Sequence, residues 1–223
     1  MARDFQRPFL LPEGATEVLL VRHGSSARST PEAPIALVDG KSDPPLSDLG
    51  RRQADAVAER LARSRIDSLF VTPLQRTQQT AGPLARRLGL RPTVIPDLRE
   101  VFLGIWEGQL NARIVGDAVL AEHVFTAQRW DVIPDAESMN RFSERVRRGL
   151  ERLADTVGPD AVAVAVVHGG VIAEACRQVT GSEAFAFLSA ENGSVTRIMR
   201  LATGRWGLIS FNDTAHLEAD QNG

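Results

Sequence analysis

The chain has 223 residues, 43% of them hydrophobic and 24% charged, which is usual for a soluble globular protein. The formal net charge of -2 gives no overall basic field, so the composition argues against a nucleic-acid partner. No apolar run has the length of a membrane span or a signal peptide, and the lone Cys176 excludes an internal disulfide framework. We therefore expect one cytoplasmic domain over residues 1–223, with flexible ends at about 1–14 and 218–223 and no membrane partner.

Strand-like and helix-like segments alternate along the chain. Near-continuous apolar runs predict strands that are covered on both faces, as in parallel sheets, at 18–21, 69–72, 93–95 and 161–167. Apolar residues at helical spacing predict helices at about 47–64, 74–88, 138–156 and 170–179. This order predicts a three-layer α/β/α domain with a mostly parallel central sheet.

Single residues and short patterns indicate where the predicted helices and strands begin, bend or end. Ser47 is a suitable N-cap for the first helix, and Pro83 should kink or break the second. An apolar–polar alternation on both sides of Thr203-Gly204 predicts a C-terminal β-hairpin. The stretch 104–136 fits no strand–helix unit, so we expect it to form an inserted cap over the sheet.

Ligands of open α/β sheets bind at the carboxyl ends of the strands. Reactive or charged side chains and flexible glycines follow the four predicted strands outside the hairpin. In chain order, the four groups are Arg22, His23 and Gly24; Arg76; Glu100; and His168 and Gly169. Taken singly, each of these residues is compatible with a solvated strand end or a tight turn. Their convergence on one edge of a sheet favours a functional site.

Such a set suits phosphoryl transfer. A neutral imidazole is a good nucleophile toward phosphorus, and the negative charge on the transferring group requires cationic donors from several directions. Arg22, Arg76 and His168 would supply those donors, with backbone N–H groups of Gly24 and Gly169 as further donors. Glu100 is the candidate general acid for the departing alkoxide. This chemistry requires no metal and no organic cofactor, and we find no metal-ligand spacing in the sequence.

Six motifs occur in a specific order: LLVRHG (19–24), DPPLSDLGRRQA (43–54), TPLQRTQQTA (72–81), LREVFLGIWEG (98–108), ESMNRFSERV (137–146) and VVHGGV (166–171). From residue 17 to about 217 the chain thereby resembles the histidine phosphatase superfamily, also called phosphoglycerate mutase-like proteins. The resemblance implies a transient phosphohistidine at His23, a phosphate pocket of Arg22, Arg76 and His168, and Glu100 as proton donor. It also implies that the insertion 104–136 is the family's variable cap, which sets substrate choice.

Two departures distinguish the chain from the mutase branch of that family. Arg28 and Ser29 stand where the mutases have tryptophan and a phosphate-binding asparagine, so Ser29 would be a weaker phosphate ligand. No lysine follows Gly108, although Arg113 is nearby. We therefore predict a histidine acid phosphatase-type phosphomonoesterase. A phosphoglycerate mutase and a catalytically silent phospholigand-binding protein are the alternatives.

The sequence does not decide the substrate beyond a small phosphorylated molecule. In the cap, arginines could bind a second anionic group and aromatic residues could stack on a ring, but all could equally be packing or surface residues: Trp106, Arg113, Phe125, Arg129 and Trp130. A homodimer is also left open, because the C-terminal hairpin could pair across a two-fold axis.

Overall fold

A computed structural model describes residues 9–28, 35, 37–38, 40–108 and 110–217, with only the backbone of 111 and 112. Ser29 and most of the two predicted flexible ends lie outside these residues. At the described part of the N-terminal end, the Gly14 N–H donates to Asp160 Oδ1 at 2.6 Å. None of the described helices is both long and apolar enough to cross a membrane.

The centre of the molecule is a six-stranded sheet with the order β5-β4-β6-β1-β7-β8. Its strands are β1 (Thr16–Arg22), β4 (Ser68–Val71), β5 (Thr93–Val94), β6 (Val162–Val167), β7 (Val195–Arg200) and β8 (Trp206–Asp213). The pairs β5-β4, β4-β6 and β6-β1 are parallel, whereas β7 and β8 form the antiparallel C-terminal hairpin and continue the sheet from β1. The mixed α/β fold with a mostly parallel central sheet is therefore confirmed.

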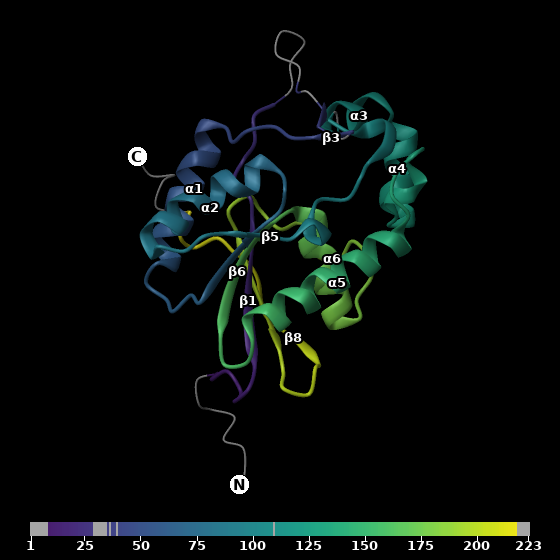
Figure 1. Cartoon of the computed structure of the whole chain (residues 1–223). Coiled ribbons are helices and arrows are strands. Elements are labelled where there is room, and N and C mark those ends of the chain that lie inside the picture. The colour runs from purple at the N-terminus through teal and green to yellow at the C-terminus, as the bar shows by residue number, and fades with distance from the viewer. Residues whose placement is uncertain (1–8, 29–34, 36, 39, 109, 218–223) are drawn as a thin grey trace.

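Helices cover both faces of the sheet (Figure 1). They are α1 (Asp48–Leu61) and α2 (Gln75–Leu88) on one face, and α5 (Met139–Val157) and α6 (Gly169–Thr180) on the other. The predicted N-cap of α1 is confirmed, since the Ser47 hydroxyl accepts the Gly50 N–H at 3.1 Å. Alternate residues of β1 serve the two layers: Leu19 and Val21 pack in one buried cluster, and Val18 and Leu20 pack in the other. Burial on both faces explains why the strand is apolar throughout.

Pro83 does not end α2, which runs through it to Leu88. The expectation of a break was therefore wrong. Proline removes one backbone donor, but Ala81 and Leu84 beside it are both only 1% exposed. Their burial against the sheet holds the helix together across the proline.

The insertion contains two short helices, α3 (Leu110–Gly116) and α4 (Ala118–Ala127), and two 3-10 turns, η2 (Gly104–Trp106) and η3 (Trp130–Val132). A third turn, η1 (Pro96–Leu98), precedes it. Trp106 and Trp130 are both buried, so the two cap tryptophans serve packing. The Arg129 guanidinium is paired with Asp131 at 2.8 Å.

A small two-stranded sheet of β2 (Leu37–Val38) and β3 (Lys41–Ser42) was not predicted. It lies near α3 (Figure 1). Its strands are too short for a periodic pattern, which explains why the sequence did not reveal them.

The loop after β1 lies directly on the first turn of α1. A Cβ atom at Gly24 would overlap the backbone of Gly50, and a Cβ atom at Gly50 would overlap the Ser25 carbonyl oxygen. The Gln53 side chain adds a hydrogen bond, accepting the Ser25 N–H at 2.8 Å. Both glycines are therefore required for the close approach that fixes the loop after His23.

We expect Gly50→Ala to lower the free energy of unfolding by about 1–3 kcal/mol or more, because the added methyl group overlaps backbone atoms. Urea denaturation measures this change. Gly116→Ala is the matched control: it is the last residue of α3, a Cβ atom there would meet open space, and the change should alter the free energy of unfolding by no more than about 0.5 kcal/mol. Equal stability of the Gly50 variant and wild type would contradict this packing argument.

Candidate active site

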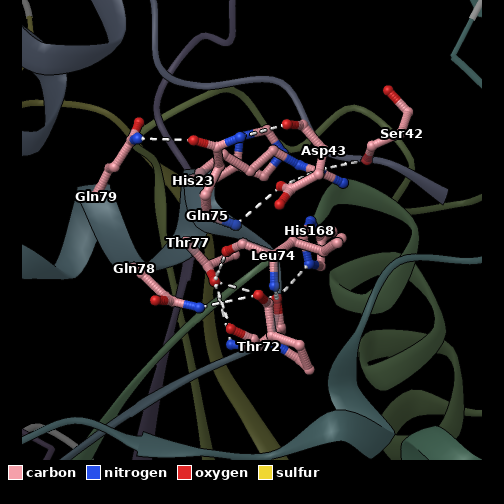
Figure 2. A network of polar contacts seen from close by, with 12 residues as sticks. His23, Ser42, Asp43, Thr72, Leu74, Gln75, Thr77, Gln78, Gln79 and His168 are labelled. Carbon is pink, nitrogen blue, oxygen red and sulfur yellow. Dashed lines mark hydrogen bonds and ion pairs between the residues drawn. The ribbon is translucent and has the colours of Figure 1, made fainter. Parts of the chain in front are cut away.

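His23 directly follows β1 and is 7% exposed. Its Nδ1 lies 2.8 Å from the Gly24 carbonyl oxygen, and because a carbonyl can only accept, the ring proton is on Nδ1. Arg76 Nε donates to the other ring nitrogen, Nε2, at 3.2 Å. The unprotonated Nε2 therefore faces a guanidinium group, within the arrangement shown in Figure 2.

The pKa of His23 is lowered from 6.5 to about 3. Burial is the largest cause, the positive charges of Arg76 and Arg22 add to it, and the hydrogen bond to Gly24 opposes it. At neutral pH the ring is therefore uncharged, which is the form that can act as a nucleophile.

His168 follows β6, is fully buried, and lies beside His23 with the two ring centroids 5.2 Å apart. Its Nε2 is 3.0 Å from the Thr72 hydroxyl, whereas its Nδ1 is buried with no hydrogen-bond partner in the part of the chain that the structure describes (Figure 2). Burial, followed by the charge of Arg76, holds the pKa of His168 well below its usual value. This ring is also neutral, and so carries a single N–H.

The threonine network at the end of β4 limits the position of that proton to two arrangements. The Thr77 hydroxyl donates toward the carbonyl oxygens of Leu74 at 2.8 Å and Thr72 at 3.1 Å. The Thr72 hydroxyl has a single proton, which it donates either to Thr77 Oγ1 or to His168 Nε2. When Thr72 donates to Nε2, the proton of His168 is on Nδ1, where it can be donated to a bound anion; when Thr72 donates to Thr77, the proton of His168 is on Nε2.

Arg76 comes from the first turn of α2 and is 8% exposed. Its Nη1 donates to the Ser42 carbonyl oxygen at 2.9 Å and lies 3.8 Å from Asp43 Oδ1. Asp43 in turn accepts the Gln75 N–H at 2.8 Å. The loop 42–43 thus fixes the direction of the guanidinium without forming a close ion pair with it.

Arg22 is the last residue of β1. Its Nη1 donates to the Ala190 carbonyl oxygen, and its Nε is buried without a partner among the described residues. Gly169 allows this packing, since a Cβ atom there would lie 3.3 Å from Arg22 Nε. Burial lowers the pKa of Arg22 and of Arg76, and the negative charge of Glu100 opposes the shift in both. Arginine is so strong a base that both groups remain cations, and Arg22 has unused hydrogen-bonding capacity.

Glu100 reaches the same place from the segment after β5. Its Oε1 accepts the Val101 N–H at 3.0 Å, and its Oε2 accepts the Gly170 N–H at 3.2 Å. A Cβ atom at Gly170 would lie 2.6 Å from Glu100 Oε1, so the glycine makes room for the carboxylate. The first turn of α6 therefore orients Glu100.

Arg145 and Glu137 hold this segment, and sequence reasoning assigned neither a role. The Arg145 guanidinium binds both Glu137 carboxylate oxygens, at 2.8 and 2.7 Å. It also donates to the backbone carbonyl oxygens of Asp97 at 2.9 Å and Glu100 at 3.0 Å. Arg145 is 5% exposed, so its ion pair with Glu137 is buried and differs from the ion pairs on the protein surface. Glu137 lies just before the N-cap of α5 and Arg145 lies within that helix, and no sequence pattern links the two.

The structure thus brings together His23, His168, Arg22, Arg76 and Glu100 as predicted. Gly24 differs from the expectation that its N–H is a phosphate donor, whereas for Gly169 that expectation stays a prediction. The Gly24 N–H is already engaged, donating to the Thr80 hydroxyl at 3.0 Å, so Gly24 serves packing, and Gly169 gives space to Arg22. Within the described ranges, no three His, Cys, Asp or Glu residues are grouped so that they could hold a metal ion.

We expect the His23 ring of the phosphate-free protein to stay neutral from pH 7 to about pH 4 and to take up a proton only near pH 3. Because the unfolded chain binds this proton near the ordinary pKa of 6.5, the contribution of His23 to stability is fully present above that pH. It is lost as the pH falls from about 6.5 through 3. An NMR titration of the histidine rings, with His23 assigned by its absence in His23→Gln, measures the pKa. A midpoint near 6.5 would contradict the buried neutral ring.

Comparison with known proteins places this geometry in a family. The family model described as "Histidine phosphatase superfamily (branch 1)" matches residues 18–214. The probable phosphoglycerate mutase GpmB of Yersinia enterocolitica is 30% identical over 210 residues, covering 91% of this chain and 95% of the relative.

Solved structures are similar over nearly the same length. A mycobacterial glucosyl-3-phosphoglycerate phosphatase has a TM-score of 0.73 at 29% identity, over 89% of this chain and 99% of that one. A phosphoglycerate mutase from Bacillus anthracis str. Sterne has a TM-score of 0.77 over 94% and 98% of the two chains. Its identity of 20% shows a shared fold alone. With the family model matched from β1 to just beyond β8, the chain belongs to the histidine phosphatase superfamily, branch 1.

Proposed function

We propose that this protein is a metal-independent phosphomonoesterase that works through a phosphohistidine on His23, with Glu100 as proton donor. One observation carries the proposal: the neutral His23 ring has its proton on Nδ1, so Nε2 keeps the lone pair that can attack phosphorus, and in the free protein this lone pair accepts the hydrogen bond from Arg76 Nε. A metal ion is unnecessary for this reaction because the nucleophile is a side chain and the charge of the phosphoryl group meets fixed cations.

In the first step, the lone pair of His23 Nε2 forms a bond to phosphorus and the bond from phosphorus to the alcohol oxygen breaks. The electron pair of that bond stays on the alcohol oxygen, which takes a proton from Glu100 as it leaves. In the second step, a water molecule attacks the phosphohistidine and gives a proton to Glu100. The P–N bond breaks, its electron pair returns to Nε2, and inorganic phosphate leaves.

The charge of the transferring group would be stabilised from three sides. Arg22 and Arg76 supply guanidinium N–H donors, and Arg22 Nε is buried without a partner among the described residues. Nδ1 of His168 is similarly buried and unpartnered in that part of the chain. Preformed donors in a dry site do not need to reorganise as charge develops, which is why they favour the transition state.

Glu100 must carry a proton in the first step. Its two carboxylate oxygens accept the backbone N–H groups of Val101 and Gly170, which hold the carboxyl group in a fixed position. That position would face the departing alcohol oxygen of an ester whose phosphoryl group is bound at His23.

Two alternatives belong to the same family. A phosphoglycerate mutase must protect its phosphoenzyme from water, and this chain has Arg28 and Ser29 where the mutases have tryptophan and a phosphate-binding asparagine. A silent phospholigand-binding protein would not need a free nucleophile, yet His23 Nε2 is unprotonated and shielded from solvent. A phosphatase is therefore the function that we propose. The names of the relatives include both a phosphatase and mutases, which is compatible with this choice.

We expect wild type to hydrolyse 4-nitrophenyl phosphate in the presence of EDTA, and His23→Ala to lower kcat/KM by at least about 10³-fold because no phosphoenzyme can form. His123→Ala is the matched control, since His123 is an exposed histidine on the cap helix α4, and it should retain wild-type activity.

Acid-labile, base-stable radiolabel from a phosphate donor should appear in wild type and be absent from His23→Ala. Stable phosphate binding without labelling or turnover would favour the silent protein. Transfer to another alcohol in preference to water would favour the mutase.

Glu100→Gln should slow esters of alkyl alcohols by about 10²–10⁴-fold and aryl phosphates with good leaving groups much less, because only the former require a proton on departure. A plot of log(kcat/KM) against the pKa of the leaving group should become steeper than in wild type. Glu122→Gln, an exposed change on α4, is the control. Equal losses for alkyl and aryl esters would show that Glu100 is not the proton donor.

A further inference from the structure

Lys41, the only lysine in the chain, lies beside the proposed proton donor. It begins the short strand β3, and its Nζ donates to the Glu100 carbonyl oxygen at 3.4 Å. The same ammonium group lies 4.9 Å from the centre of the Phe102 ring. These two contacts are weak for a group that has three N–H donors and a full charge.

The carboxylates around Lys41 are engaged elsewhere. Glu107 accepts the backbone N–H of Ser42 at 2.8 Å with one oxygen and that of Leu103 at 3.0 Å with the other. Glu137 is held by both arms of Arg145. In the part of the chain that the structure describes, the Lys41 ammonium has no ion-pair partner of its own.

A second cation with unused capacity is close to this lysine. Burial lowers the pKa of Lys41, Glu107 opposes the shift, and the positive charges of Arg145 and Arg99 add to it. Arg145 is fully used in holding Glu137 and the 97–100 backbone, but Arg99 Nε is buried with no hydrogen-bond partner among the described residues. Two neighbouring cations whose nearby carboxylates are engaged by other groups favour binding of an anion.

The position of this pair is defined relative to the phosphate pocket. Ser42, next to Lys41, accepts a hydrogen bond from Arg76 Nη1 with its carbonyl oxygen at 2.9 Å. Lys41 itself contacts the backbone of Glu100, whose side chain would protonate the departing alcohol. The ammonium group therefore lies on the side of the pocket where the alcohol part of an ester would be held.

We propose that Lys41 and Arg99 bind a second anionic group, a carboxylate or a further phosphate, on the alcohol part of the substrate. This inference rests on the proposed function, because it takes the phosphoryl group to be bound at His23. It narrows the substrate class to small phosphate esters that carry another negative charge a short distance from the ester. Charge-assisted hydrogen bonds to that group would orient the ester oxygen toward Glu100.

Two esters with the same carbon skeleton test this assignment: 3-phosphoglycerate, which has a carboxylate, and glycerol 3-phosphate, which has a hydroxymethyl group in its place. We expect Lys41→Gln to lower kcat/KM at least tenfold more for 3-phosphoglycerate than for glycerol 3-phosphate, mainly through KM. Lys41→Arg should restore most of the difference. Arg91→Gln, an exposed change before β5, should alter neither ester. Equal losses on both esters would mean that Lys41 only supports the Glu100 backbone, and would overturn the proposal.

A binding measurement separates this proposal from the proposed function. Protein labelled with ¹³C-lysine gives one lysine side-chain signal, because Lys41 is the only lysine. We expect saturating 3-phosphonopropionate to shift that signal and propylphosphonate, which lacks the carboxylate, to leave it nearly unchanged. A shift with propane-1,3-diphosphonate alone would identify the second group as a phosphate. Equal responses to all three compounds, or none, would overturn the subsite even if the protein is a phosphatase. The selective shift would support the subsite even if no ester is hydrolysed.

Discussion

The parallel pairing of β1 with β6 is the interaction on which the site depends. It places Arg22 opposite Val167, and the hydrogen bond from the His23 N–H to the Val167 carbonyl oxygen at 3.0 Å continues the ladder by one residue. The two histidines that follow these strands are thereby brought side by side without any contact of their own side chains being needed. A shift of one residue in this register would turn one of the rings away from the other.

Burial then gives each ring its chemical state. In water a histidine would be partly protonated near neutral pH, and a protonated ring is no nucleophile. Here desolvation and two buried guanidinium groups hold His23 neutral, while the Gly24 carbonyl oxygen decides which nitrogen keeps the proton. The same cations that suppress protonation of the ring are placed to attract a phosphate. In the proposed mechanism, one arrangement of charge would therefore both keep the nucleophile neutral and bind the phosphoryl group.

Sequence reasoning succeeded where one local signal determined a feature. Apolar runs predicted the strands, and the residues directly after them predicted the chemical groups, because strand ends must meet at one edge of a parallel sheet. It failed where a residue acts through a distant contact. Arg145 was indistinguishable from a surface arginine until its burial against the backbone of Glu100 was known, and Lys41 lies on a strand of two residues with no periodicity. The packing that carries α2 through Pro83 is likewise a property of the whole fold.

The proposed proton donor and the proposed nucleophile are anchored to parts of the fold with different resistance to local opening. His23 and His168 follow two central strands, whose backbone amides should exchange with solvent only when the whole sheet unfolds. Glu100 follows β5, an exposed edge strand of two residues, and depends on the clamp between Arg145 and Glu137. Partial unfolding at this edge would release the acid while leaving the nucleophile in place. A molecule damaged in this way would still accept phosphate from activated donors while failing on ordinary esters, so its loss of function would be selective before it became complete.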